Sequence, residues 1–205
     1  MKRYIDKIKQ LLSSLPAEEE LPFAKAKVED ISTDTLRVLL HRLHDRGEIT
    51  ITKRGFFKIE KEPFREYLFV YGSLKKGFDN HHLLSKYTQR IGKSITIDKF
   101  AMYEDSFGNY PYLTPTPIYR IHGELYLIQR KELLEKLDKF EGSPEYFIRK
   151  KIFVKSHKGV IRAYVYMRTD VKVSNDAIPL RVWENDTALK TKRLQNYFDK
   201  ILEDA

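Results

Sequence analysis

Residues 67–77 read Tyr67-Leu68-Phe69-Val70-Tyr71-Gly72-Ser73-Leu74-Lys75-Lys76-Gly77, and the rest of the chain is best interpreted from this stretch. Its first half is apolar or aromatic and its second half begins with small residues, which indicates a buried strand running into a tight turn. Such a turn can present backbone N–H groups and a hydroxyl to a pocket. A buried strand with an ordinary exit turn explains the same pattern, so both interpretations stay open on composition and spacing alone.

The length and composition predict two unequal domains. A chain of 205 residues has room for a domain of ordinary size and a smaller one. Hydrophobic residues make up 41% and charged residues 33% of the chain, which predicts a packed core and a well-solvated surface. No apolar run approaches the roughly 20 residues that cross a bilayer, and the N-terminus shows no signal-peptide pattern. We therefore expect a cytoplasmic protein without a membrane partner.

The absence of cysteine excludes disulfides, thiolate nucleophiles and cysteine-built zinc sites. Among the six histidines, His81 and His82 are the only adjacent pair, and neighbouring residues on a helix point in different directions. No metal site is predicted. The net charge of +9 favours anionic partners, although a basic balance alone mainly affects solubility.

The N-terminal part is predicted to contain helices followed by a β-hairpin. Apolar residues recur at helical spacing from Met1 to about Ser14, and again from the N-cap Ser32 to about Gly47. Residues 21–28 are predicted as a short helix or an extended piece. Two alternating segments, 48–52 and 56–59, flank a basic turn and form the hairpin. This order resembles the winged helix-turn-helix modules of bacterial transcription regulators and of abortive-infection antitoxins.

The winged-helix resemblance implies a set of DNA-contacting residues. On the recognition helix these are Thr33, Thr35, Arg37, His41 and Arg42, and in the wing they are Lys53 and Arg54. A module for dimerisation or for docking on a protein is the alternative. Residues 1–62 contain 13 Lys and Arg against 11 Asp and Glu, and this net charge of +2 is low for a DNA-binding domain.

The second domain is predicted to be strand-rich. A short charged linker before Pro63 predicts a boundary between domains 1–62 and 63–205. The predicted strands are 66–72, 94–103, 119–128, and a hairpin of 147–155 with 160–168. The predicted helices are 81–87, 131–140 and 186–202. The last helix has an apolar face that would pack on the domain or form a homodimer.

Two motifs in this domain resemble those of one enzyme superfamily. The stretch Val70–Gly77, with Asn80 and His81 after it, resembles the opening signature of the gamma-glutamylcyclotransferase superfamily. The stretch Leu137-Asp138-Lys139-Phe140-Glu141-Gly142-Ser143-Pro144 resembles the segment that carries that family's catalytic glutamate, and Gly123-Glu124-Leu125-Tyr126 is similar as well. The resemblance spans about residues 67–167 and is closest to the AIG2-like gamma-glutamylaminecyclotransferase branch. It implies an α+β fold: a small mixed β-barrel with flanking helices, here preceded by the winged-helix domain.

The resemblance also implies a reaction and a base. Family members, classed as transferases or lyases, release 5-oxoproline from a small γ-glutamyl substrate through attack of its α-amine on its γ-carbonyl, and no cofactor is required. Glu141 corresponds to the general base. It follows an apolar residue at the predicted end of a helix, where the helix dipole disfavours a negative charge and so raises a carboxyl pKa.

The remaining candidate residues are predicted to bind substrate. Tyr71, Gly72, Ser73 and Leu74 would form the loop that receives a substrate oxygen, while Tyr146 and Arg149 follow the glutamate. Ser73 is not expected to be a nucleophile, because it lacks the glycines two residues before and two residues after it that a nucleophile elbow has. Lys75 and Lys76 are expected to be solvated, with attraction of an anionic substrate as the alternative. Tyr110, Tyr112 and Tyr119 are candidates for the pocket wall or for the core.

Two other functions fit the same residues. In the first, the protein is a non-enzymatic regulator or antitoxin whose pocket senses a γ-glutamyl-like ligand and whose winged helix binds DNA. In the second, the winged helix mediates only protein contacts.

Overall fold

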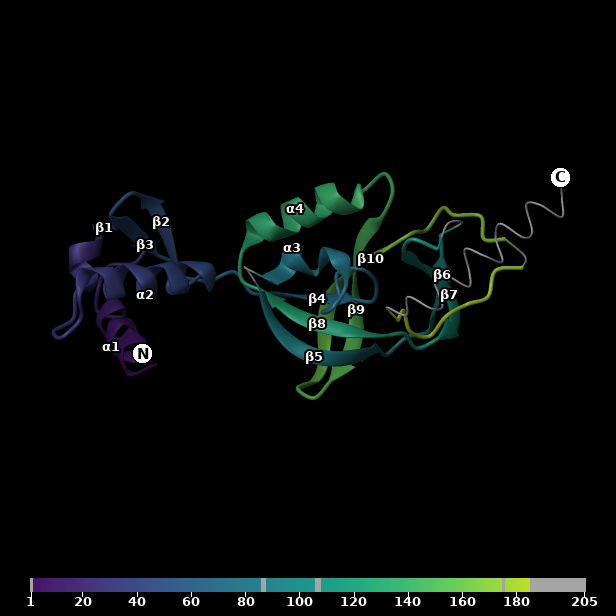
Figure 1. The fold of residues 1–205 in the computed structure, drawn as a ribbon, viewed down its shortest axis with the longest axis horizontal. Coiled ribbons are helices and arrows are strands. Elements are labelled where there is room, and N and C mark those ends of the chain that lie inside the picture. Colours follow the sequence, from purple (N-terminus) through teal and green to yellow (C-terminus); the bar gives the residue numbers. More distant parts are fainter. Residues whose placement is uncertain (1, 86–87, 106–107, 175, 185–205) are drawn as a thin grey trace. The chain divides into compact units, whose positions relative to one another are not determined.

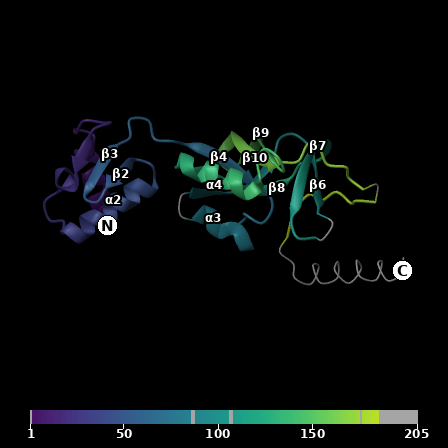
Figure 2. The same ribbon diagram turned by 90° about the horizontal axis from the view of Figure 1, so that it is seen from above.

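The structure is a computed structural model that describes residues 2–85, 88–105, 108–174 and 176–184 (Figures 1 and 2). The chain divides into two units. Unit 1 contains the chain up to Arg65 together with Ile128–Lys131, and unit 2 contains Glu66–Leu127 and the chain from Glu132 onward. The domain boundary predicted between residues 62 and 63 lies close to this division.

Unit 1 combines two helices with a small sheet. Its elements are α1 (Lys2–Leu12), β1 (Glu20–Pro22), the 3-10 helix η1 (Phe23–Ala26), α2 (Thr33–Asp45), β2 (Ile49–Lys53) and β3 (Phe56–Ile59). Helix α2 begins after Ser32, whose hydroxyl accepts a hydrogen bond from the Thr35 N–H at 3.2 Å, as expected for an N-cap. The strands pair in the order β1-β3-β2. Ile8, Leu39, Leu40, Leu43 and Phe57 are fully buried between the helices and the sheet.

Unit 2 is built around a sheet that closes on itself. Its strands follow the order β10-β4-β8-β5-β9, in which β10 (Gly159–Met167) pairs parallel with β4 (Glu66–Val70) and antiparallel with β9 (Ile148–Ser156). The other two strands are β5 (Thr88–Thr96) and β8 (His122–Ile128). Alternate residues of the hairpin, Ile152, Val154, Ala163 and Val165, are buried inside this sheet.

The described part of unit 2 also contains short helices and a second sheet. The helices are η2 (Asp79–His81), α3 (His82–Ser85) and α4 (Lys131–Glu141), and the second sheet pairs β6 (Phe100–Glu104) with β7 (Pro111–Tyr119). In both ribbon views α4 runs alongside the closed sheet (Figures 1 and 2). Leu133, Leu134 and Leu137 form its buried face. These elements confirm the predicted α+β class.

The predicted strand 94–103 is wrong, because the chain turns in its middle. Strand β5 ends at Thr96, whose hydroxyl donates to the Asp98 carbonyl at 2.7 Å, and β6 begins in another sheet at Phe100. Strand β7 was missed because Pro111, Pro115 and Pro117 argue against a strand in the sequence. A two-stranded sheet tolerates them, since β7 pairs with β6 alone.

Two predicted helices reach residues that the structure does not describe. The helix predicted at 81–87 is present as η2 and α3 up to Ser85, and residues 86 and 87 lie outside the described part. The helix predicted at 186–202 lies wholly outside it.

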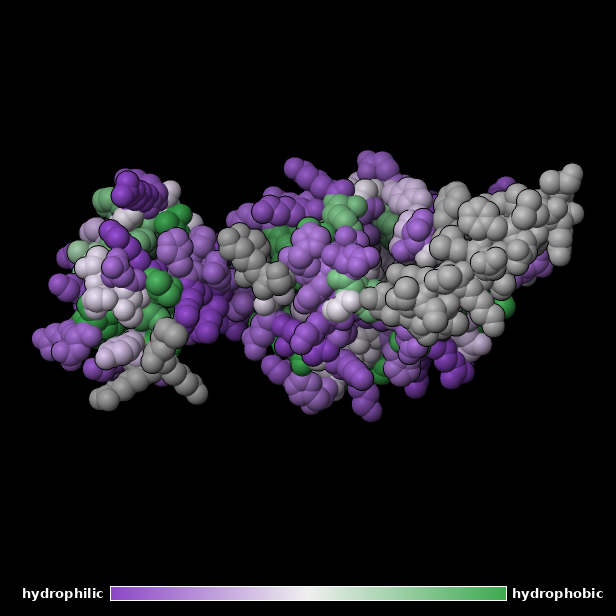
Figure 3. Space-filling model, in the orientation of Figure 1, coloured by the Kyte–Doolittle hydropathy of each residue, from purple (hydrophilic) through white to green (hydrophobic). Residues whose placement is uncertain are grey.

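Hydrophilic residues dominate the described surface that Figure 3 shows. Among residues 2–85, 88–105, 108–174 and 176–184, no helix has the length and apolar character that crossing a membrane requires.

Gly123 of β8 packs closely against the end of β4. A Cβ at this position would lie 2.4 Å from the Val70 carbonyl oxygen and 2.6 Å from the Phe69 ring. We expect Gly123→Ala to lower the free energy of unfolding by about 1–3 kcal/mol, and Gly123→Ser to lower it further, because the larger side chain needs more displacement. Urea denaturation followed by the fluorescence of Trp183, the single tryptophan, measures this in unit 2.

Gly159 provides the matched control. At Gly159 the backbone φ of +95° disfavours a side chain, but nothing lies within 4 Å of a Cβ. Gly159→Ala and Gly159→Ser should therefore lower the free energy of unfolding by similar amounts. If Gly123→Ala and Gly123→Ser lowered the free energy of unfolding equally, the packing explanation would be contradicted.

Candidate active site

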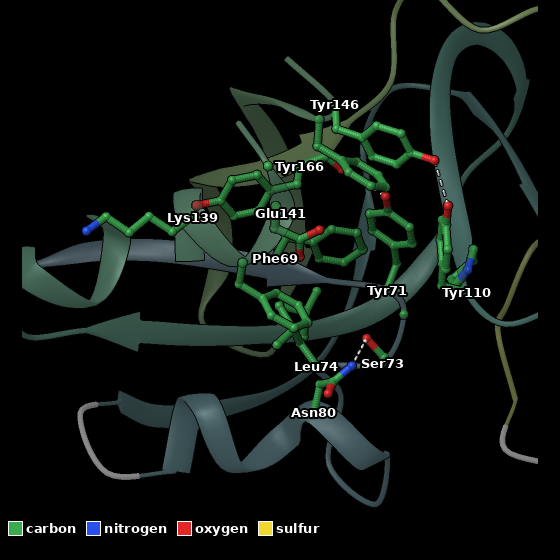
Figure 4. A pocket seen from close by; sticks show the side chains of 16 residues that line it. Phe69, Tyr71, Ser73, Leu74, Asn80, Tyr110, Lys139, Glu141, Tyr146 and Tyr166 are labelled. Carbon is green, nitrogen blue, oxygen red and sulfur yellow. Dashed lines mark hydrogen bonds between the residues drawn. The ribbon is translucent and has the colours of Figure 1, made fainter. Parts of the chain in front are cut away.

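A cavity of about 470 Å³ lies in unit 2 where the loop after β4, the end of α4 and the start of β7 meet (Figure 4). Its lining includes the predicted residues Tyr71, Gly72, Ser73, Leu74, Glu141 and Tyr146. The structure therefore brings together two motifs that are about seventy residues apart in the sequence.

The loop after β4 is held by its own hydrogen bonds. The Lys75 N–H donates to the Gly72 carbonyl at 3.1 Å, and the Asn80 side-chain amide donates to the Ser73 hydroxyl at 3.0 Å. Gly72 packs so closely against Pro111 that a Cβ would lie 2.8 Å from its ring. In the part of the chain that the structure describes, the N–H groups of Gly72, Ser73 and Leu74 have no backbone acceptor.

Glu141 is the last residue of α4 and enters the cavity from the opposite side. Gly142 follows with φ +60°, a left-handed conformation that ends the helix and favours glycine. The Ser143 N–H donates to the Asp138 carbonyl at 2.8 Å and closes this turn. Loss of hydration in the cavity raises the pKa of Glu141 from 4.5 to about 7. A carboxyl group with this pKa exchanges protons near neutral pH.

Tyr71 forms part of the rigid wall next to Glu141. Its hydroxyl donates to the Tyr166 carbonyl at 2.8 Å and accepts from the Leu113 N–H at 3.2 Å, so both hydrogen-bonding directions are occupied. Burial, together with the nearby Glu141 charge, raises the pKa of Tyr71 far above its ordinary value. Tyr71 therefore stays protonated and supports the cavity.

Aromatic residues form the rim of the cavity. The Tyr110 and Tyr146 hydroxyls are 2.9 Å apart, and both rings pack near Phe147 (Figure 4). Burial and the hydrogen bond with Tyr146 raise the pKa of Tyr110 to about 12. Tyr112 is buried against Tyr103, and Tyr119 packs on the core cluster, so neither belongs to this lining.

Arg149, a predicted substrate-binding residue, is not in the lining of the cavity. Its Nη1 donates to Asp138 Oδ2 at 2.8 Å. The cavity instead contains Phe69, Asn80 and Tyr166, to which no role was assigned from the sequence. The position of Asn80 beside the first motif was the available signal for one of them, whereas Phe69 and Tyr166 look like ordinary strand residues.

Lys75 was expected to be solvated, and this expectation is wrong. Its side chain is buried and donates to the Trp183 carbonyl, while its Nζ lies 4.7 Å from the centre of the Phe78 ring. Lys76 is exposed as expected. The Lys76 N–H donates to the buried Glu124 carboxylate at 2.9 Å, which fixes the far end of the loop.

The predicted DNA-contacting residues lie in unit 1. Thr33, Arg37, His41, Arg42, Lys53 and Arg54 are exposed, and Thr35 is partly buried. Lys53 is paired with Glu20 at 2.7 Å, and Arg37 lies 3.5 Å from Asp34. Within the described residues of the chain, no cluster of three or more His, Asp or Glu side chains is arranged to hold a metal ion.

Comparison with known proteins agrees with the resemblance seen in the two motifs. The model of the family described as gamma-glutamyl cyclotransferase, AIG2-like, matches residues 68–185. A protein of Methanocaldococcus jannaschii provisionally named a gamma-glutamylcyclotransferase is 42% identical over 103 residues, which are 49% of this chain and 82% of the relative. Gamma-glutamylaminecyclotransferase A of Danio rerio is 34% identical over 98 residues, which cover 45% of this chain and 60% of the relative.

A solved structure shows the same fold. The crystal structure of an AIG2-like protein from Mus musculus superposes with a TM-score of 0.55 at 22% identity, covering 60% of this chain and 92% of that chain. At this identity the likeness concerns the fold alone. The family model, however, matches more than half of the chain. The chain therefore belongs to the gamma-glutamyl cyclotransferase, AIG2-like family and is an enzyme of this class.

Proposed function

We propose that the protein releases 5-oxoproline from a γ-glutamyl amine or peptide, with Glu141 as the general base. The observation that carries this proposal is the position of Glu141: its carboxyl group, with a pKa raised to about 7, lies in one cavity with the Gly72–Leu74 loop. A base works best when its pKa is close to the working pH. At its ordinary pKa of 4.5 the same carboxylate would be a weaker base.

The proposed reaction needs no second substrate. The α-amine nitrogen attacks the γ-carbonyl carbon, a five-membered ring closes, and the amide bond to the leaving amine breaks. Because nucleophile and electrophile belong to one molecule, the enzyme mainly has to fold the substrate so that they meet. Glu141 accepts the proton of the attacking amine and returns it to the leaving nitrogen, which balances the step.

The loop after β4 is proposed to bind the oxygens of the substrate. Its free N–H groups suit a carboxylate or the oxyanion that forms when the carbonyl is attacked. The Ser73 hydroxyl already accepts from Asn80 and keeps its own proton for donation. Tyr146 is proposed to contact the leaving group at the rim, whereas the contact of Arg149 with Asp138 argues for a role within the protein.

A second candidate function belongs to unit 1. Helix α2, the β1-β3-β2 sheet and the hairpin turn with Lys53 and Arg54 have the element order of a winged helix. The observation that favours DNA binding is the exposure of the cationic residues on α2 and on the hairpin. In this alternative, the unit 2 cavity senses a γ-glutamyl-like ligand and unit 1 acts as a regulator. A homodimer and a cytoplasmic location stay predictions.

Removing the base tests the leading proposal. We expect Glu141→Gln to lower the release of 5-oxoproline by about 10²–10⁴-fold, because the amide cannot accept the proton. Chromatography with mass detection measures release from γ-glutamyl amino acids, γ-glutamyl-ε-lysine and glutathione. Glu135→Gln, an exposed change on the same helix, is the control and should behave as wild type. Unchanged release by Glu141→Gln would refute the role of Glu141.

The raised pKa of Glu141 also predicts how stability depends on pH. A carboxyl group with a higher pKa in the folded than in the unfolded state favours folding at low pH, and this contribution disappears as the pH rises from 4.5 to about 7. The loss approaches about 3 kcal/mol, since one pKa unit corresponds to about 1.4 kcal/mol. Denaturant titrations of wild type and Glu141→Gln across this range measure the difference. The free energy of unfolding of Glu141→Gln should not show this decrease with pH. Parallel plots of the free energy of unfolding against pH for the two proteins would contradict the prediction.

DNA binding by unit 1 is tested with a triple variant. Replacing Arg37, Lys53 and Arg54 with Gln should weaken binding to double-stranded DNA and reduce the salt dependence, because phosphate contacts are lost. Fluorescence anisotropy at two or more salt concentrations measures both. A triple Gln variant of Lys150, Lys155 and Lys158 in unit 2 changes the net charge equally and should bind as wild type. Equal weakening by both variants would indicate only non-specific attraction.

A further inference from the structure

Asp138 joins helix α4 to both strands of the β9–β10 hairpin. Its Oδ1 accepts a hydrogen bond from the Tyr166 hydroxyl at 2.8 Å, and its Oδ2 accepts one from Arg149 Nη1 at 2.8 Å. Tyr166 and Arg149 are direct partners in the antiparallel register of the hairpin. The two oxygens of one carboxylate therefore attach the helix to a single rung of the sheet.

The main chain of Asp138 fixes the turn that contains Glu141. The Asp138 carbonyl accepts from the Ser143 N–H at 2.8 Å, and the Gly142 carbonyl accepts from the Tyr146 N–H at 2.7 Å. Glu141 lies inside the first of these closed turns. Any shift of Asp138 relative to the sheet therefore moves the end of the helix and the carboxyl group of Glu141 with it.

Through Tyr166, the contacts of Asp138 extend to the wall of the cavity that contains Tyr71. Tyr166 lines the cavity, and its carbonyl accepts the Tyr71 hydroxyl at 2.8 Å (Figure 4). Tyr71 in turn is near enough to feel the Glu141 charge. Asp138 itself is outside the lining, so it acts on the cavity only through other residues.

We propose that Asp138 is a positioning residue, which together with Arg149 and Tyr166 holds the last turn of α4 so that Glu141 stays in the cavity beside Tyr71. The inference rests on the proposed function for the role of Glu141. It gives Arg149 a part in the site without contact with the substrate.

A second ion pair serves as a matched control. Lys151, on the same strand as Arg149, pairs with Glu66 at 2.9 Å, and both side chains are 28% exposed. Asp138 and Arg149 are each 27% exposed and 2.8 Å apart. The two pairs are therefore alike in burial and distance, but Glu66 and Lys151 do not belong to the cavity.

The experiment measures the pKa of Glu141 in the intact protein by carbon-13 NMR of glutamate side chains, with the signal assigned from Glu141→Gln. In wild type we expect a value of about 7. Asp138→Ala should lower it towards 4.5, because a loosened turn lets water reach the carboxylate, and Asp138→Asn should give an intermediate value. Removing the side chain of Glu66 or of Lys151 should leave the pKa of Glu141 unchanged. Tyr166→Phe, which removes the hydroxyl that donates to Asp138 and keeps the aromatic ring, provides a milder change if Asp138→Ala does not fold.

Kinetics give a second readout of positioning. Displacing the base should reduce kcat by about 10-fold or more with a smaller change in KM, because substrate binding relies on the loop after β4. A pKa that stays at about 7 in folded Asp138→Asn and Tyr166→Phe would overturn the proposal and leave Asp138 as an ordinary structural residue. A wild-type pKa of about 7 without any release of 5-oxoproline would refute the proposed function instead, since the NMR shift does not depend on turnover.

Discussion

A carboxylate becomes a stronger base where its surroundings exclude water, because loss of hydration disfavours its charged form. In this protein, loss of hydration raises the pKa of Glu141, the last residue of α4. The helix ends at a glycine in the left-handed conformation, and the cavity holds the carboxyl group beside aromatic side chains. Burying the ionisable carboxyl group of Glu141 costs free energy. The folding of unit 2 as a whole offsets this cost.

The closed sheet supplies the framework for this arrangement. Strand β4 delivers the Gly72–Leu74 loop to one side of the cavity, and the β9–β10 hairpin anchors the end of α4 on the other. Close packing fixes the loop at two points: Gly72 lies against Pro111, and Gly123 on the neighbouring β8 lies against Val70. Under the proposed function, these walls would fold a γ-glutamyl group so that its own reacting atoms meet, which suits an intramolecular reaction.

Local signals in the sequence predicted the elements whose pattern is regular. Helix α4 and the β9–β10 hairpin agree with their apolar periodicity, and the two motifs indicated the family. The division of 94–103 into two strands and the proline-containing β7 depend on which sheet each segment joins, and periodicity does not carry that information. Arg149 pairs with Asp138, and buried Lys75 donates to the Trp183 carbonyl. Both are contacts between distant segments, so composition and spacing could not distinguish these side chains from solvated or substrate-binding ones.

The central claim is that the loop after β4 and Glu141 act on the same small γ-glutamyl-derived molecule. A crystal structure of the protein with 5-oxoproline tests it most directly. The account predicts the ring nitrogen within hydrogen-bond distance of the Glu141 carboxyl group, and an oxygen of the ligand on the N–H groups of Gly72–Leu74. A ligand bound elsewhere, or bound in this cavity without contact with Glu141, would contradict it.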